Sequence, residues 1–183
     1  MRNHLIIVLC LYLSLYSYNL QAENFVLIHG ENHLYSLLIP DGWMTNRTLA
    51  QRLGIPAPFF SHPRNESNIK TFIYSYGYEN RDQTIKKFIK ISQNRLQNAL
   101  PKIHIDRKGD VKTKYGSRAI LYHYNNFRDN HVEDVAFTQA KNIICVIVLS
   151  TREKENYEKQ YSEFLKTVKS FYYISESPQS FGK

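Results

Sequence analysis

The chain has 183 residues, enough for one domain with its own hydrophobic core. Its 24 lysines and arginines outnumber its 16 acidic residues, and the resulting net charge of +8 favours a partner or surface that carries negative charge. The positive charges are spread from Arg47 to Lys183, which is typical of a solvated basic surface and not of one concentrated nucleic-acid-binding run.

The first 22 residues have the pattern of a secretory signal peptide. Arg2 precedes an apolar run from Leu5 to about Tyr18, and Ala22 offers a small residue at a plausible cleavage site. The run is shorter than the roughly 20 residues that span a bilayer, which favours cleavage over a permanent anchor. We therefore expect a periplasmic or secreted protein with no transmembrane segment after cleavage and no nucleic-acid partner. Cleavage would remove Cys10 and leave Cys145 alone, so the mature chain could form no intrachain disulfide.

The segments that follow predict strands. Two apolar runs, Phe25–His29 and Tyr35–Ile39, are separated by a loop that contains glycine and asparagine, which predicts a short hairpin. Pro40–Trp43 predicts a turn after which the tryptophan can fold back on the sheet. From Met44 to Pro63 the pattern is irregular, apart from a short edge strand expected at Phe59–Phe60.

The middle of the chain predicts a strand, a helix and three more strands. The alternation in Ile69–Tyr78 predicts a strand with four aromatic residues on one side: Phe72, Tyr74, Tyr76 and Tyr78. Asp82 then offers an N-cap for a helix that Pro101 ends. The inward stripe of this helix is Ile85, Phe88, Ile89, Ser92, Leu96 and Ala99. The strand-like segments that follow are Ile103–Lys114, Ser117–Tyr124 and His131–Ala140.

Seven consecutive apolar residues, Ile143–Leu149, predict a strand buried on both faces, because a half-exposed strand would alternate. Cys145 lies within this strand, between Ile144 and Val146. A nucleophilic cysteine needs an accessible setting that stabilises its thiolate. We therefore interpret Cys145 as a small buried hydrophobic residue.

The last long segment predicts an amphipathic helix. Ser150 and Glu153 have the spacing of a capping box at its start. The apolar stripe is Tyr157, Tyr161, Phe164, Leu165, Val168, Phe171 and Tyr172. The opposite side carries Lys154, Glu155, Glu158, Lys159, Glu163, Lys166 and Lys169. Residues 174–183 are polar and lack periodicity, so we expect one domain over residues 23–173 and a mobile C-terminal tail.

Two helices with runs of adjacent strands between them predict an α+β fold with an antiparallel sheet. The stretch Tyr35–Trp43 (YSLLIPDGW) resembles the strand and IP-x-x-W opening of the PsbP-like and DcrB-like family. The closing strand and helix are similar too, so the resemblance covers about Phe25–Tyr173. It implies a PsbP-like α/β/α sandwich, in the same fold group as the Ran-binding nuclear import factor of yeast, and members that mainly dock other macromolecules. No functional residue carries over, because Pro40 and Trp43 are structural in character.

The sequence offers little catalytic or metal-binding chemistry. His29, Glu31 and His33 are weak candidates for metal ligands, but Gly30 and Asn32 place them in a loop and not on a helix, where this spacing would converge. A phosphate loop, a nucleophile elbow and a CxxC pair are absent from the sequence, so we expect no cofactor and name no catalytic residue. An active site assembled from dispersed residues stays open.

Two sets of residues are candidates for binding. The first is aromatic and lies on two predicted strands: Tyr74, Tyr76, Tyr78, Tyr122 and Tyr124. These side chains either pack under the helices or line a groove for a peptide, a glycan or a lipid headgroup, and we favour packing. The second set is basic and lies on the final helix: Lys154, Lys159, Lys166 and Lys169.

We therefore expect an exported bacterial binding or accessory protein, with a secreted effector among its possible roles. It would do no chemistry and would dock another protein or an anionic surface. The alternative is a small secreted hydrolase or metal-dependent enzyme whose active-site residues are dispersed in the sequence.

Overall fold

The computed structural model describes residues 24–55, 59–62, 70–80, 83–125, 131–153 and 155–175. No helix in these ranges is long and apolar enough to cross a membrane. The predicted signal peptide, the N-cap Asp82, Lys154 and the tail beyond Ser175 lie outside the described residues.

A seven-stranded antiparallel sheet forms the centre of the domain, with strand order β3-β4-β5-β9-β8-β7-β6. The strands are β3 (Met44–Thr45), β4 (Phe59–Ser61), β5 (Thr71–Glu79), β6 (His104–Lys112), β7 (Arg118–Asn125), β8 (Val132–Ala140) and β9 (Ile143–Thr151). All nine residues of β9 are buried, as the apolar run in its sequence predicts. It is the central strand, with β5 and β8 on either side.

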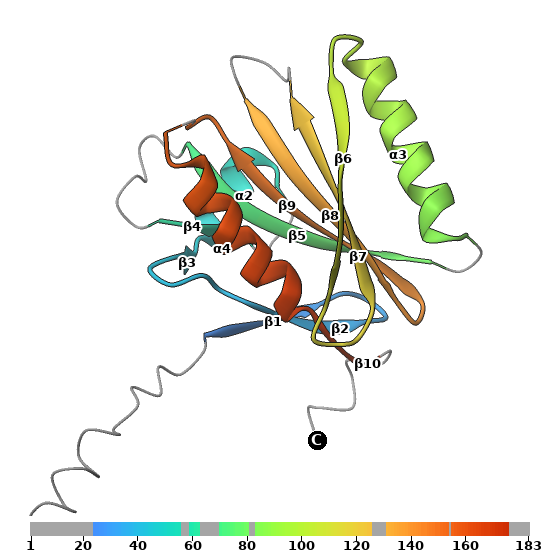
Figure 1. Ribbon diagram of the computed structural model, residues 1–183. Helices are drawn as coiled ribbons and strands as arrows, with labels where there is room; N and C mark the ends of the chain where they lie inside the picture. The colour runs from blue at the N-terminus through green and yellow to red at the C-terminus, as the bar shows by residue number, and fades with distance from the viewer. Residues whose placement is uncertain are drawn as a thin grey trace, which may run out of the picture.

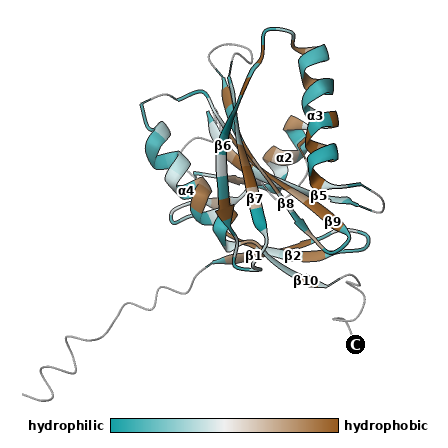
Figure 2. Ribbon diagram, turned by 45° about the vertical axis from the view of Figure 1, so that its right-hand side comes forward, coloured by the Kyte–Doolittle hydropathy of each residue, from teal (hydrophilic) through white to brown (hydrophobic). Residues whose placement is uncertain are grey.

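Helices cover both faces of this sheet (Figures 1 and 2). α3 (Ile85–Ala99) packs on one face, where its Ile89 joins the valines of β9 in a core cluster. α4 (Tyr157–Ser170) packs on the other face, where its Phe164 and Val168 join a second cluster. The predicted α+β sandwich, with an antiparallel sheet between two main helices, is confirmed.

A second, three-stranded sheet closes one end of the sandwich (Figure 1). It consists of β1 (Phe25–His29), β2 (Leu34–Leu38) and β10 (Tyr172–Ser175) in the order β1-β2-β10. The predicted hairpin is confirmed, but β10 was not predicted. The final helix ends at Ser170 and not at Tyr172, and the first two residues assigned to the tail belong to β10. The reason is that Phe171 leaves the helical conformation, with φ −47° and ψ 124°, after which Tyr173 pairs with Tyr35 of β2.

The starts of the two long helices also differ from the prediction. The capping box is wrong, because Ser150 and Thr151 are still part of β9 and α4 begins six residues later, after Asn156. Thr151 instead accepts a hydrogen bond from the backbone N–H of Glu153. At the start of α3, Thr84 is the N-cap residue.

A short helix, α2 (Arg47–Leu53), lies in the segment that had no recognisable pattern. Asn46 caps it by accepting a hydrogen bond from the backbone N–H of Leu49, and Gly54 ends it with a positive φ of 64°. Trp43, just before α2, is buried and donates from Nε1 to Oε2 of Glu163 on α4, at 2.9 Å. The prediction that this tryptophan folds back is therefore confirmed.

Candidate functional site

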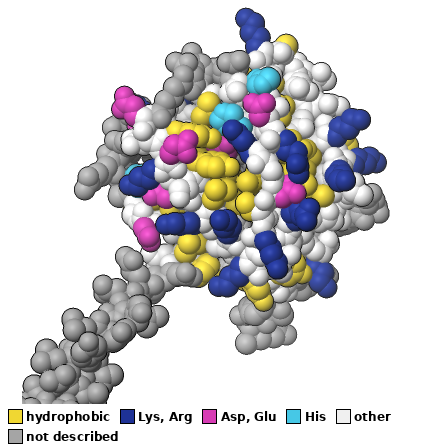
Figure 3. Space-filling view, viewed as in Figure 1, with side chains coloured by type: hydrophobic (Ala, Val, Ile, Leu, Met, Phe, Trp, Pro, Cys, Tyr) yellow, Lys and Arg dark blue, Asp and Glu magenta, His cyan; other side chains and the backbone are white. Residues whose placement is uncertain are grey.

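One side of α4 combines aromatic, aliphatic and basic side chains in what we call the α4 surface. The half-buried residues Tyr157, Tyr161 and Leu165 follow one another at i, i+4 and i+8, so they lie along one flank of the helix. The exposed basic residues on this surface are Lys159, Lys166 and Lys169, and the exposed Glu158 lies beside the two tyrosines. Figure 3 shows hydrophobic side chains exposed between α4 and the strands β6 and β7, with both basic and acidic side chains around them.

A hydrogen-bonded cluster fixes the first residue of this flank. The register of β7 and β8 places His123 opposite Asp134, and Nδ1 of His123 lies 2.9 Å from Oδ1 of that carboxylate. Tyr157 donates from its hydroxyl to the other oxygen, Oδ2, also at 2.9 Å. Burial and the nearby charge of Asp134 raise the pKa of Tyr157, so its hydroxyl keeps its proton.

Because this cluster fixes Tyr157, the neighbouring aromatic rings of the α4 surface are also held in place. Tyr161 stacks on Tyr157 with ring centroids 5.8 Å apart and an angle of 19° between the ring planes. Tyr161 in turn packs on the fully buried Phe164. Side chains that are already ordered lose little conformational entropy when a partner binds, and tyrosine contributes both apolar area and a polar tip.

The predicted tyrosines lie on the opposite face of the sheet. Tyr74, Tyr76 and Tyr78 form a row on β5, with centroids 6.1 Å and 5.4 Å apart, while Tyr122 and Tyr124 form a second row on β7. β9 and β8 lie between these strands, so the two rows do not meet.

Most of this tyrosine face belongs to the core under α3. Tyr124 is buried, and Tyr74, Tyr76 and Tyr122 are partly buried in the same cluster. Burial raises the pKa of Tyr124 to about 12, and its hydroxyl accepts a hydrogen bond from Gln93 of α3 at 3.4 Å. Tyr78 differs, because it is 51% exposed at the edge of α3. The geometry favours packing as the role of four of the five tyrosines.

A serine, a histidine and a glutamate meet at one edge of the tyrosine face, which bears on the enzyme alternative. Ser150 and Glu133 are opposite each other on β9 and β8, and Nε2 of His131 lies 2.5 Å from Oγ of Ser150. Burial raises the pKa of Glu133 to about 7 and, with the charge of Arg152, lowers that of His131. Ser150, however, is fully buried, so its hydroxyl has no access to a substrate. The arrangement satisfies buried polar groups and does not form a nucleophilic site.

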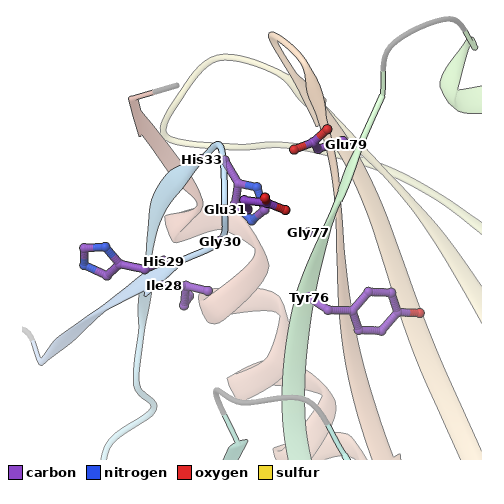
Figure 4. Close-up of a pocket in the computed structure, with 8 residues that line it drawn as sticks. All are labelled: Ile28, His29, Gly30, Glu31, His33, Tyr76, Gly77 and Glu79. Atoms are coloured by element: carbon purple, nitrogen blue, oxygen red, sulfur yellow. The ribbon is translucent and has the colours of Figure 1, made fainter. Parts of the chain in front are cut away.

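A pocket of about 300 Å³ opens between the β1–β2 loop and the end of β5 (Figure 4). Its lining includes His29, Glu31, His33 and Glu79. The imidazole of His33 is buried against the backbones of Gly30 and Gly77, where a Cβ atom would come within 2.0 Å and 2.6 Å of the ring. These two glycines therefore make room for His33.

The electrostatics of this pocket centre on His33. Burial lowers its pKa, although the charge of Glu79 acts in the opposite direction. Asn32 donates a hydrogen bond to Oε1 of Glu79. Within the described part of the chain, Nδ1 of His33 is buried and has no hydrogen-bond partner.

The weak metal candidates His29, Glu31 and His33 all line this pocket, but they do not converge on one point. Figure 4 shows the ring of His29 turned away from the other two side chains. Among the residues that the structure describes, no group of three His, Cys, Asp or Glu side chains could hold a metal ion.

Cys145 is inaccessible in the centre of the sheet. Its thiol is fully buried, 3.4 Å from the hydroxyl of Ser75, which in turn lies 2.9 Å from the hydroxyl of Tyr35. Burial raises the pKa of the thiol to about 12, the opposite of what a nucleophilic cysteine needs.

Solved structures of other proteins share this architecture at low sequence identity. Cyanobacterial PsbP (CyanoP) from Synechocystis sp. PCC 6803 matches with a TM-score of 0.53 and 12% identity, over 85% of this chain and 96% of that one. The Ran-binding protein Mog1p from Saccharomyces cerevisiae has the same TM-score and identity, over 84% and 96%. LpqN of Mycobacterium tuberculosis, involved in cell envelope biogenesis, has a TM-score of 0.53 and 11% identity, over 84% and 92%. The chain has the PsbP/Mog1-like fold.

At these identities the similarity establishes the PsbP/Mog1-like fold and does not transfer a function. It confirms the architecture implied by the YSLLIPDGW stretch and the closing strand and helix. No protein-family model matches the sequence, and no curated protein matches it.

Within this PsbP/Mog1-like domain, the residues singled out from the sequence occupy three separate places. The described lysines lie together on α4, the tyrosines lie on the α3 side, and the metal candidates line the pocket beside β5. Sequence reasoning missed His123, Asp134 and the tyrosine that joins them. One signal was available: Asp134 is a charged residue on the face of β8 that also carries the small buried residues Ala136, Thr138 and Ala140.

Proposed function

We propose that the chain is an exported, non-catalytic binding protein that docks a partner protein through the α4 surface. The observation that carries this proposal is the ordered flank formed by Tyr157, Tyr161 and Leu165 beside three exposed lysines. Tyrosine is enriched among the few residues that supply most of the affinity in protein interfaces, while charges at the rim guide association.

The chemistry of this surface favours an acidic partner. The lysines of α4 extend the basic character of a chain whose net charge is +8. A partner with carboxylates around an apolar centre would complement both the flank and its rim.

The proteins that share the fold support a role in macromolecular contact. Mog1p binds Ran, and LpqN is involved in cell envelope biogenesis. Export is supported by the charged start, the short apolar run and Ala22. N-terminal sequencing of the protein recovered outside the cytoplasm should find Glu23 first, and recovery of Met1 from a membrane fraction would contradict cleavage.

Affinity capture from an envelope extract, read by mass spectrometry, tests the docking proposal. The bait variant Tyr161→Ser, Leu165→Ser should lose the partner that the natural chain retains. A control that replaces exposed apolar residues on α2 and α3, Leu53→Ser with Ile91→Ser, should retain it. Equal capture by both variants would contradict docking through the α4 surface.

A screen of hydrolase substrates and of metal content tests the enzyme alternative on the same purified protein. We expect no turnover that depends on a single side chain and no stoichiometric metal. Turnover abolished by Asp134→Asn or by a histidine substitution, or one zinc per chain, would overturn the non-catalytic function.

A further inference from the structure

The outer face of the three-stranded sheet exposes large hydrophobic side chains at the end of the molecule. Phe25 is 39% exposed, Leu27 is 56% exposed and Tyr172 is 45% exposed. The register places Leu27 and Tyr172 in one row, on either side of Ser36. Phe25 lies in the next row, opposite the half-buried Leu38. The side chains between them, Tyr35 and Leu37, point to the other face and are fully buried.

Basic side chains adjoin this small-sheet face, which we define as Phe25, Leu27, Leu38 and Tyr172. The ammonium group of Lys114 lies 5.1 Å from the centre of the Phe25 ring. The backbone N–H of Lys114 donates to the carbonyl of Lys169, so the last turn of α4 lies close by. Figure 3 shows hydrophobic side chains next to lysines and arginines along this lower edge of the molecule.

We propose that the small-sheet face binds the surface of a membrane that contains anionic lipids. Exposed aromatic and aliphatic tips can enter the boundary between headgroups and acyl chains, while lysines stay at the level of the phosphates. Tyrosine is enriched at that depth because its ring is apolar and its hydroxyl is polar. The hydrophobic side chains match the apolar acyl region of the bilayer, and the neighbouring lysines match the negative charge of its headgroups.

The course of the chain also favours a membrane over a soluble partner. The predicted signal peptide ends at Ala22 and β1 begins at Phe25, so the small-sheet face follows directly on the segment that the bilayer would hold during export, until cleavage. Binding through this face would leave the α4 surface on the side of the sandwich, open to a protein (Figure 1). This inference goes beyond the docking function and does not depend on it.

Vesicle sedimentation of the full chain, as purified from the cells that make it, tests the inference. The vesicles are equimolar phosphatidylglycerol and phosphatidylcholine, with phosphatidylcholine alone as the neutral comparison. The test variant carries Phe25→Ser, Leu27→Ser and Tyr172→Ser. The matched control removes three hydrophobic residues of similar exposure elsewhere, 46%, 49% and 37%: Met44→Ser, Leu53→Ser and Ile91→Ser.

We expect the natural chain and the control to bind the anionic vesicles equally well and the test variant to bind at least about tenfold more weakly. Lys114→Gln should lower binding about fivefold at low salt, and both effects should be smaller on phosphatidylcholine alone. Any predicted N-terminal segment that remains is common to all variants, so it cannot produce the difference. Circular dichroism melts verify that each variant is folded.

Two outcomes would overturn the proposal. The first is equal binding by the test variant and the control, which would show that the small-sheet face is not involved. The second is a failure of the natural chain to bind anionic vesicles. A dimer in sedimentation velocity that the test variant lacks would then make the face an interface between copies of this chain.

Discussion

Replacing Glu133 by glutamine should stabilise the protein at alkaline pH. The Glu133 side chain is 15% exposed, and burial raises its pKa from 4.5 to about 7. Between those two pH values the folded state holds a proton that the unfolded state has released. The free energy of unfolding therefore falls as the pH rises from about 4.5 through about 7, and the cost of the buried charge is fully present above that range.

The size of the effect follows from the pKa difference. A difference of about 2.5 (7 minus 4.5) corresponds to at most about 3 kcal/mol, and solvent at the exposed part of the side chain reduces this. Glutamine keeps the shape and stays neutral, so we expect Glu133→Gln to raise the free energy of unfolding by about 1–3 kcal/mol at pH 8.5. Near pH 4.5 the two proteins should differ little.

Urea unfolding of both proteins across this pH range measures the difference directly. Nε2 of His131 lies 3.9 Å from Oε1 of Glu133, and burial lowers the pKa of this histidine, so it is neutral in both proteins at pH 8.5, where the difference is read. Glu158→Gln, at an exposed position of α4, is the control, and its stability difference should stay near zero throughout. A Glu133→Gln variant that is less stable at pH 8.5, or whose difference does not change with pH, would refute the reasoning.

Three more predictions concern buried groups. Cys145 should react with a thiol reagent only after unfolding, and Cys145→Ser should cost about 1–3 kcal/mol in urea, so rapid labelling of the native protein would contradict its burial. Gly77→Ala should destabilise the fold because its Cβ would lie 2.6 Å from the His33 ring, and adding His33→Ala should restore part of the loss in a double-mutant cycle. Tyr157→Phe removes the hydrogen bond to Asp134 and should lower the free energy of unfolding by about 1–3 kcal/mol; an unchanged thermal melt would exclude a structural role for that bond.

The parts of the fold that were predictable are those that a local pattern determines. Seven apolar residues identify β9 as the central strand, and alternation places the aromatic residues of β5 on one face. The end of α4 could not be predicted, because Phe171 and Tyr172 fit both a helical stripe and the strand β10. Pairing with β2, 136 residues away in the chain for Tyr172 and Ser36 (172 minus 36), decides between them.

In the candidate site, too, the parts that a local pattern determines were predictable and the contacts between distant elements were not. Helical spacing alone identifies the lysines and the aromatic flank of α4. The cluster that orders this flank joins His123, Asp134 and Tyr157, which come from three elements. Their meeting depends on the register of β7 with β8 and on the position of α4 over the sheet, and neither can be read from local sequence.

The kinetics of partner binding test the docking account most directly. One variant reverses the lysines of α4: Lys159→Glu, Lys166→Glu and Lys169→Glu. A matched variant makes the same change in net charge on α3, at the exposed residues Lys86→Glu, Lys87→Glu and Lys90→Glu.

With the captured partner immobilised, surface plasmon resonance at several salt concentrations gives the association rate for each protein. The α4 variant should associate about tenfold or more slowly at low salt, and the α3 variant should stay close to the natural chain, because charges near the interface guide the encounter. The difference should shrink as salt rises, since exposed charges are screened over about 8 Å at physiological ionic strength. Equal slowing by both variants would mean that only net charge matters, and it would contradict docking through the α4 surface.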